Sequence, residues 1–314
     1  MNLQQFRFVR ETVRSNFNLT KAAQALFTSQ PGVSKAIIEL EDELGVKIFE
    51  RHGKRIRGLT KPGQQVAEVI QRIMVEVDNL RRVSADFARH DEGDLVIACT
   101  HAQARYLLPQ VIPAFRERFP QVRVSLAEGS PPHLAEMVLL EQADLAIATE
   151  TLWQTEGLAA MPVYDWEHVL VVKPDHPLAD MPLSEAREIN LQAIAGYPII
   201  TYDHAFSGRR TIDAVCAEAG VELDIVLSAI DADIIKTYVD VGLGIGIIAG
   251  MAFDPRRDKG LVGLPLGHLF GTHTTRVAVK SNVFLRDYVY VFIEMLAAEL
   301  TRDVVNKALL GGAD

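Results

Sequence analysis

The chain has 314 residues, of which 48% are hydrophobic and 23% are charged, the composition of a globular protein with two or three domains. Disordered, collagen-like and disulfide-scaffold classes are therefore excluded. Its two cysteines, Cys99 and Cys216, are too few and too far apart for a zinc motif or a secreted disulfide framework. We expect no disulfide, no metal site and a reducing compartment.

The N-terminus shows no basic region followed by an apolar run, so we expect no signal peptide. The longest apolar stretch, 241–253, carries four glycines and is shorter than the roughly 20 residues of a membrane-spanning helix. The sequence therefore predicts a cytoplasmic protein without a membrane partner.

The net charge of -9 is unevenly distributed. Residues 1–90 hold 15 Lys and Arg against 10 Asp and Glu, whereas residues 91–314 hold 17 against 31. A basic N-terminal region on an acidic body predicts that only the N-terminal region contacts a polyanion such as DNA.

The first 60 residues have the pattern of three short helices and a hairpin. Helical spacing of apolar residues predicts helices over 3–15, 21–27 and 31–45. The turn between the second and third helices is short and polar, which is typical of a helix-turn-helix whose third helix enters the DNA major groove. Strands over 46–49 and 56–60 flank a basic turn with Gly53 at its tip, and this hairpin is interpreted as a wing.

One long helix is expected from residue 61 to about residue 89. A stripe at steps of four and three predicts a dimerisation seam, made of Val66, Ile70, Ile73, Val77, Leu80, Ser84 and Phe87. The alternative is a helix packed against its own domain.

Beyond the polar segment 90–94, strands alternate with helices. Strands are expected over 95–100, 122–128, 143–149, 168–173, 198–202, 224–229, 244–248 and 275–280, with helices over 105–119, 132–142, 209–219, 234–241 and 285–300. Such succession predicts a mainly parallel sheet with crossover helices. The chain returns to its first half at the end, which predicts two α/β lobes with a ligand cleft between them.

The succession of these parts resembles a LysR-type transcriptional regulator, and the most specific stretch runs from Ala22 to Arg51. The resemblance implies an α/β protein with an all-α winged helix-turn-helix head over 1–60 and a linker dimerisation helix over 61–90. A two-lobed, periplasmic-binding-protein-like effector domain over 91–314 completes it. Lobe I is expected at about 91–165 and 269–314, and lobe II at about 166–268.

Four further stretches, 100–106, 143–150, 231–239 and 300–305, resemble the CysB group of that family, whose members regulate cysteine biosynthesis and sulfur assimilation. The resemblance implies an effector such as sulfate, thiosulfate, O-acetylserine or N-acetylserine. It places that effector at Thr100, Ala102, Gln103, Thr149 and Ser207. A hydroxyl residue is usual where Ala102 stands, and Ser207 replaces a threonine.

The residues themselves support an anion site at these positions. Thr100 ends one strand and precedes a helix, so amide groups near Ala102 and Gln103 can point at an anion. Thr149 follows another strand, and Ser207 opens a helix in the other lobe. The alternative is that the three hydroxyl residues are ordinary helix caps.

The DNA-binding residues are expected at the start of the third helix and on the wing. Gln30 suits adenine, Ser29 and Ser34 suit phosphate or a base, and Lys35 suits phosphate. Wing cations would add affinity and salt dependence, and they are Arg51, Lys54 and Arg55. The resemblance also implies double-stranded DNA as partner, a homotetramer and contact with RNA polymerase.

Three other classes of protein fit the sequence less well. An α/β enzyme is disfavoured because the glycines of 242–249 lie before and within an apolar strand, and because Asp231 and Asp233 suit helix capping. A periplasmic solute-binding protein would need an export signal, and it would have no use for the basic N-terminal region. A constitutive architectural DNA binder would not need the cleft. Regulators of sulfonate or sulfate-ester use, or of an unrelated pathway, stay open.

Overall fold

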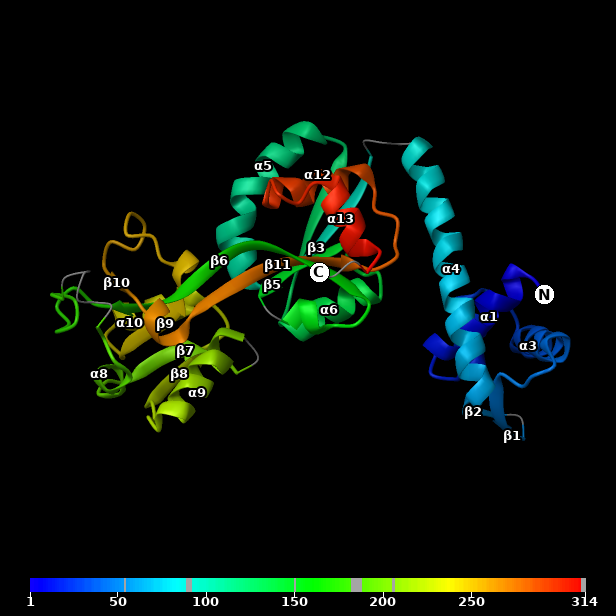
Figure 1. The fold of residues 1–314 in the computed structure, drawn as a ribbon, viewed down its shortest axis with the longest axis horizontal. Helices are drawn as coiled ribbons and strands as arrows, with labels where there is room; N and C mark the ends of the chain where they lie inside the picture. Colours follow the sequence, from blue (N-terminus) through cyan, green and yellow to red (C-terminus); the bar gives the residue numbers. More distant parts are fainter. Residues whose placement is uncertain (54, 89–91, 150, 182–187, 205–206, 312–314) are drawn as a thin grey trace. The chain divides into compact units, whose positions relative to one another are not determined.

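The structure is a computed structural model that describes residues 1–53, 55–88, 92–149, 151–181, 188–204 and 207–311 (Figure 1). The chain divides into two compact units, Met1–Ala88 and Arg89–Asp314. Among the described residues, none of the helices has the length and apolar character needed to cross a bilayer.

The N-terminal unit begins with three helices, as expected. They are α1 (Leu3–Arg14), α2 (Leu19–Ala25) and α3 (Gln30–Leu44). Ser29 caps α3 through its hydroxyl oxygen, which accepts the amide of Gly32 at 3.3 Å, and Gly45 ends the helix in the left-handed region at φ 71°. Val33, Ile37 and Leu40 of α3 are fully buried against α1 and α2.

The wing consists of the antiparallel strands β1 (Phe49–His52) and β2 (Arg55–Leu59). The predicted turn over 50–55 was too wide, because strand pairing extends inward to His52 and Arg55. Glu41 of α3 attaches the wing to the helices. Its buried carboxylate accepts the amides of Ile48 and Phe49 at 2.9 and 3.0 Å.

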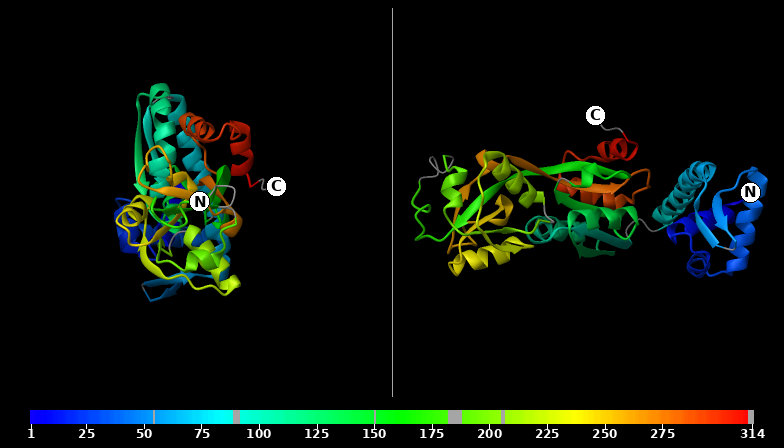
Figure 2. Two further views of the ribbon diagram at one scale, coloured as in Figure 1. Left: turned by 90° about the vertical axis from the view of Figure 1, so that its left-hand side faces the viewer. Right: turned by 90° about the horizontal axis from the view of Figure 1, so that it is seen from below.

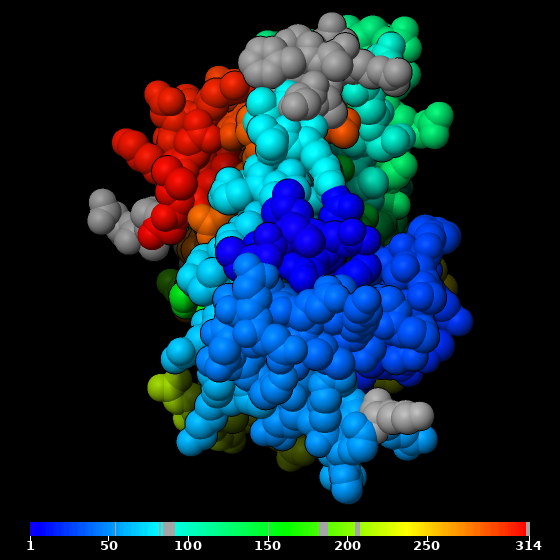
Figure 3. Space-filling model, turned by 90° about the vertical axis from the view of Figure 1, so that its right-hand side faces the viewer, coloured from blue at the N-terminus to red at the C-terminus, as the bar shows by residue number. Residues whose placement is uncertain are grey.

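The long helix α4 (Lys61–Ala88) packs its first half against its own head. Ile70 and Met74 are buried there, and Asp78 accepts a hydrogen bond from Arg10 of α1 at 2.7 Å. Gly63 is required at the start of the helix, since a Cβ there would lie 1.9 Å from the carbonyl oxygen of Ile48. Figure 3 shows the surface of this unit in blue and cyan.

This packing corrects the predicted seam. Val66, Ile70 and Val77 belong to the core of the head, so the alternative of a helix packed on its own domain is right for them. Ile73 and Leu80 stay exposed, and they are joined by Val69, which the prediction omitted. The side chains of Ser84 and Phe87 lie outside the described residues.

Lobe I of the second unit is a sheet between two helical layers. Its elements are β3 (Gly93–Cys99), η1 (Gln103–Leu107), α5 (Leu108–Arg118), β4 (Val122–Glu128), α6 (Pro131–Leu139), β5 (Leu145–Thr149), η2 (Thr151–Gln154), α12 (Asp287–Leu296) and α13 (Arg302–Leu309). Side chains alternate across the sheet. Leu95, Ile97 and Ile147 face a core with α5 and α12, whereas Ala146 and Ala148 face α6.

Lobe II repeats this layering. Its elements are α8 (Leu191–Ala195), β7 (Ile199–Tyr202), α9 (Ser207–Ala219), β8 (Ile225–Ala229), α10 (Ala232–Asp240), β9 (Ile245–Ala249), η3 (Gly250–Ala252), β10 (Val262–Pro265) and α11 (Gly267–Phe270). One core joins the sheet to α8, α9 and α11, and a second core joins it to α10.

Two long antiparallel strands, β6 (Leu158–Val172) and β11 (Thr272–Lys280), connect the lobes (Figure 2). The strand order is β4-β3-β5-β11-β6-β9-β7-β8, with β10 paired to β6. The sheet is therefore mixed, whereas a mainly parallel sheet was expected, because both connecting strands run against their neighbours. The predicted last helix over 285–300 is shorter than expected, since α12 ends at Leu296, and a further helix, α13, which was not predicted, begins at Arg302.

Candidate effector pocket and DNA-binding surface

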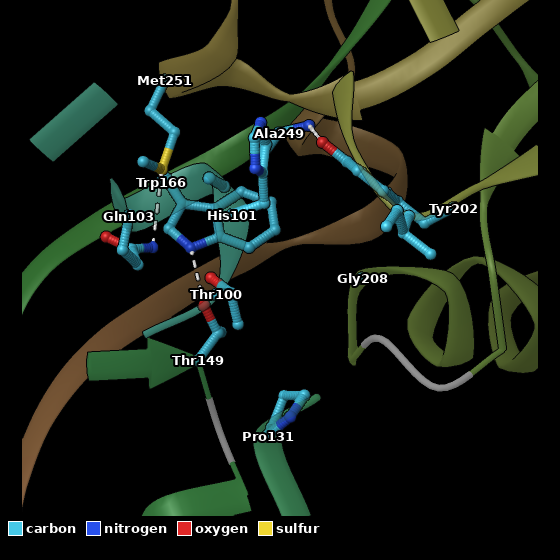
Figure 4. A pocket seen from close by; sticks show the side chains of 12 residues that line it. Thr100, His101, Gln103, Pro131, Thr149, Trp166, Tyr202, Gly208, Ala249 and Met251 are labelled. Carbon is cyan, nitrogen blue, oxygen red and sulfur yellow. Dashed lines mark hydrogen bonds between the residues drawn. The ribbon is translucent and has the colours of Figure 1, made fainter. Parts of the chain in front are cut away.

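A pocket lies between the lobes of the second unit, where β3, β5 and β6 approach α9 and η3 (Figure 4). About 510 Å³ is unfilled between its walls, counting the open mouth. It is lined by Thr100, His101, Ala102, Gln103, Pro131, Thr149, Trp166, Tyr202, Gly208, Ile230, Ala249 and Met251. Four of the five predicted effector residues therefore lie together. The fifth, Ser207, begins α9 beside Gly208, and its side chain lies outside the described part of the chain.

A hydrogen-bond network holds the polar wall of the pocket. The hydroxyl of Tyr164 donates to Gln103 Oε1 at 2.9 Å, which turns the amide nitrogen of Gln103 toward Thr275 Oγ1 at 3.4 Å. The Thr275 hydroxyl is also 3.4 Å from Thr149 Oγ1. The Trp166 indole donates to that same Thr149 oxygen at 3.3 Å, as Figure 4 shows.

The backbone directly after Thr100, where a helix begins at His101, differs in part from the expectation. The amide of Gln103 donates to the carbonyl oxygen of Thr100 at 3.0 Å, so it is already satisfied and cannot serve an anion. The amides of His101 and Ala102 belong to the first helical turn, which has no intrahelical acceptor for them. They remain the candidate backbone donors.

Aromatic rings form the wall behind Thr149. Trp166 of β6 stacks on His273 of β11, with ring centroids 4.5 Å apart. His168 lies 4.7 Å from His273 and is fully buried. Burial, and next the proximity of His273, lowers the pKa of His168 to about 3, so its ring is neutral. A Cβ on Gly208 would lie 3.1 Å from His168 Nε2, so this cluster meets the start of α9 closely.

Other charged residues near the pocket have structural roles. Arg209 is buried and binds Asp213 at 2.7 Å and the carbonyl oxygen of Tyr202 at 3.1 Å. Asp231 caps α10, as predicted, by accepting the amide of Ile234 at 2.8 Å. Asp233 binds Tyr106 at 2.7 Å and Arg105 at 3.1 Å across the lobes.

The sequence alone does not identify Trp166, Tyr202 and Met251 as pocket residues, or Tyr164 as a partner of Gln103. Trp166 precedes the expected strand over 168–173, and nothing in its neighbourhood along the chain marks a ligand. Its partner Thr149 is 17 residues earlier. Pairing of Trp166 with His273 in the sheet decides its position.

At the candidate DNA-binding surface, Ser29, Lys35 and Arg55 are exposed, and Gln30 and Ser34 are partly exposed. The Ser29 hydroxyl is engaged as the cap of α3. Arg51 is mostly covered, and its guanidinium lies 3.9 Å from the buried Glu41 carboxylate. Lys54 lies outside the described residues.

Phe27 stands out in the turn of this surface. It is 99% exposed and has a left-handed backbone, with φ 51°. The amide of Thr28 donates to the carbonyl oxygen of Ala23 at 2.9 Å, so Phe27 occupies the position of a helix-ending motif that glycine usually fills.

The winged head and the two-lobed pocket domain together define a DNA-binding regulator with a ligand-binding domain. Comparisons with known proteins agree. Residues 3–64 match the bacterial regulatory helix-turn-helix protein of the lysR family, and residues 88–301 match the LysR substrate binding domain.

Similar curated proteins cover almost the whole chain. It is 55% identical over 314 residues to the HTH-type transcriptional regulator CysB of Burkholderia cenocepacia, with 100% of this chain and 99% of the relative covered. It is 52% identical to the regulator SsuR of the same organism, with 99% and 98% covered. The cofactor-binding domain of the Cbl transcriptional regulator is similar in structure, with a TM-score of 0.65 and 41% identity over 70% of this chain and 94% of that one.

The chain therefore belongs to the LysR family of transcriptional regulators. Its helix-turn-helix domain is a DNA-binding module, and its second domain is built to bind a small molecule. The relatives are regulators and not enzymes, which removes the α/β enzyme as an interpretation of the two-lobed body.

Proposed function

We propose that this regulator controls genes of cysteine biosynthesis and sulfur assimilation in response to a small anionic effector. The observation that carries the proposal is the interlobe pocket, in which Thr100, Gln103 and Thr149 converge with the first-turn amide of Ala102. Full-length similarity to CysB and SsuR supports the regulated pathway. The candidate effectors are sulfate, thiosulfate, O-acetylserine and N-acetylserine.

Hydroxyl and amide groups suit an anion because each donates a hydrogen bond to one of its oxygen atoms. Thr149 and Thr100 are both more than nine-tenths buried, so their hydrogen bonds to an effector would be little weakened by competing water. Ser207 adds a hydroxyl residue at the start of α9, on the side of lobe II.

The proposed mechanism is closure of the lobes around the effector. Thr149 belongs to lobe I and Gly208 to lobe II, so a ligand that contacts both favours the closed arrangement over the open one. The change would alter how paired effector domains pack in a homotetramer, and thereby the spacing or bend of the bound DNA.

At the DNA end, we propose that Gln30 and Ser34 contact bases while Ser29, Lys35 and the wing cations Arg55 and Lys54 contact phosphate. Arg51 would hold the wing through Glu41 as well as meet the backbone. RNA polymerase is the further proposed partner of the DNA-bound form, and the cytoplasm is the proposed compartment.

Two copies of the head would pair through α4. Val69, Ile73 and Leu80 expose 44%, 37% and 67% of their surface and lie on the helix away from the head's core. The helix α4 extends past α1, as Figure 1 shows. A dimer would bring together two half-sites on the DNA.

The test is a thermal-shift titration of the whole protein with the four candidate effectors. Stabilisation should rise with ligand concentration and disappear in Thr149→Ala. The matched control is Thr272→Ala, an exposed threonine of β11 outside the pocket lining, which should keep the full shift. Equal shifts in both variants would contradict the pocket.

A further inference from the structure

The pocket has two chemically different walls. Hydrogen-bond donors gather on the first, around Thr100, Gln103 and Thr149. The second, on lobe II, carries the apolar side chains of Ile230, Ala249 and Met251, and Ala102 and Pro131 add apolar surface on lobe I. A ligand whose whole surface consists of oxygen atoms would lose its hydrating water against the apolar wall and gain no hydrogen bonds there. A ligand with a polar head and a small apolar group satisfies both walls.

Charge restricts the head of that ligand. Among the described residues that line the pocket, none is a lysine or an arginine. His101 is the lining histidine, and its Nδ1 lies 2.9 Å from the carboxylate of Glu128, which adds negative charge close by. Burying an anion without a countercharge is costly, and a dianion costs more than a monoanion.

The hydrogen atoms of the polar wall also point one way. An indole nitrogen only donates, so Thr149 Oγ1 accepts from Trp166 and keeps its own proton available. Thr275 Oγ1 lies within reach of the Gln103 amide nitrogen, which is a donor, and is 3.4 Å from Thr149 Oγ1. Thr149 thus presents a donor to the pocket, beside the amides of His101 and Ala102. Such donors match the unprotonated oxygens of a head group that carries no hydrogen.

We propose that the effector of this pocket is an organic monoanion with an R–SO3⁻ head, either a small organosulfonate or a monoalkyl sulfate. The proposal rests on the proposed function and names the ligand class of that same site. The three sulfonate oxygens take the donors of Thr149, Thr100 and the first-turn amides, and the alkyl group lies on Ile230 and Ala249. Ala102 has a methyl group and no hydroxyl, and thus favours the alkyl group over another oxygen.

The test is isothermal titration of the whole protein in Tris chloride, because sulfonate buffers would compete for the site. The probes are ethanesulfonate, ethyl sulfate, inorganic sulfate, propionate and ethylphosphonate. They distinguish the contribution of the head group to affinity from that of the alkyl group, since propionate keeps the ethyl group and sulfate keeps the sulfur-bound oxygens. We expect ethanesulfonate or ethyl sulfate to bind at least 10-fold more tightly than each of the other three, and the stronger of the two identifies the source of the head group.

Two variants test the walls separately. Ile230→Ser should weaken the ethyl-bearing sulfur ligand about 5-fold and leave sulfate unchanged, whereas Val226→Ser, an exposed position outside the lining, should change neither. Ala102→Ser should increase the affinity for sulfate relative to the affinity for the ethyl-bearing sulfur ligand by about 5-fold. Thr149→Ala should weaken every bound probe, which shows that the heat comes from this pocket.

The outcomes are distinct. The proposed ligand class is overturned if sulfate, propionate or ethylphosphonate binds as tightly as ethanesulfonate and ethyl sulfate. If that binding is also lost in Thr149→Ala, the effector pocket itself is still supported. Failure of all five probes to bind also overturns the ligand class. If acetylserines and thiosulfate then fail as well, the proposed function loses its effector site.

Discussion

The indole nitrogen of Trp166 donates a hydrogen bond to the hydroxyl oxygen of Thr149, 3.3 Å away. Thr149 ends the central strand β5 of lobe I, and Trp166 lies on the connecting strand β6 where the chain passes to lobe II. The bond therefore links the polar wall of the pocket to the strands that join the lobes, and it leaves the proton of Thr149 for another acceptor.

Replacing Trp166 by phenylalanine tests this link. The ring is kept but the donor is lost, so Thr149 can turn its proton elsewhere. Removal of one hydrogen bond is worth about 1 kcal/mol, and we expect effector affinity to fall about 5-fold. Titration calorimetry measures the loss, and unchanged affinity would show that Thr149 is positioned without the indole.

The two ends of α3 are among the most predictable features of this chain. Pro31 and Gly45 marked the two ends of α3, because each residue has a backbone preference that is independent of the rest of the fold. The end of α12 could not be found in this way. Leu300 is buried in the same core as Phe292, so apolar periodicity continues across the break at Ala297.

The pocket was predictable only where its residues follow strands. Thr100 and Thr149 each stand at the end of a buried strand, which the sequence shows directly. Trp166 and Met251 meet Thr149 and Gln103 only through the antiparallel pairing of β6 and β11 and the contact between lobes. The seam on α4 was misjudged for a related reason, since a helical stripe does not reveal whether its own head or a second copy covers it.

The buried ring of His168 predicts a pH dependence of folding. Its pKa is about 3 in the folded chain and about 6.5 when unfolded, so the unfolded chain binds the proton first. The stabilisation is complete above pH 6.5 and falls as the pH drops toward 3, by up to about 1.4 kcal/mol per pH unit. Urea unfolding at pH 7, 6 and 5 measures this slope.

The control for His168 is His168→Phe, which cannot be protonated. Its free energy of unfolding should decline less steeply than that of the wild type over the same range. Parallel declines would assign the acid sensitivity to other groups.

The exposed face of α4 predicts separate effects on assembly and folding. Leu80→Asp should dissociate the dimer and leave the head folded, because the side chain is 67% exposed. Ile70→Asp should instead unfold the head, since burying an unpaired carboxylate costs several kcal/mol. Sedimentation and circular dichroism separate the two results, and an intact Leu80→Asp dimer would remove this face as the interface.

Phe27 predicts a substitution that stabilises the protein. Glycine adopts the left-handed backbone without strain, and the exposed ring loses no packing when it is removed. Phe27→Gly should raise the free energy of unfolding of the head by up to about 1 kcal/mol. Chemical denaturation decides this, and a loss of stability would mean that the ring packs in the folded chain.

The carboxylate of Glu41 predicts a substitution that destabilises the protein. It accepts two wing amides and lies near Lys47 and Arg51. Glu41→Gln removes the charge from a fully covered position and should cost the head about 1 to 3 kcal/mol. DNA affinity should fall with it as the wing loosens. An unaltered unfolding midpoint would show that the wing is held by its apolar contacts alone.

The most direct test of the regulator as a whole is its DNA affinity with and without effector. Fluorescence anisotropy and footprinting on DNA bearing its binding site would be done for the wild type and for Thr149→Ala. We predict that an effector bound in the pocket changes the affinity or the footprint of the wild type, and that the variant binds the same DNA without responding. A wild type whose affinity, footprint and DNA bending are all unchanged by a bound effector would contradict the account.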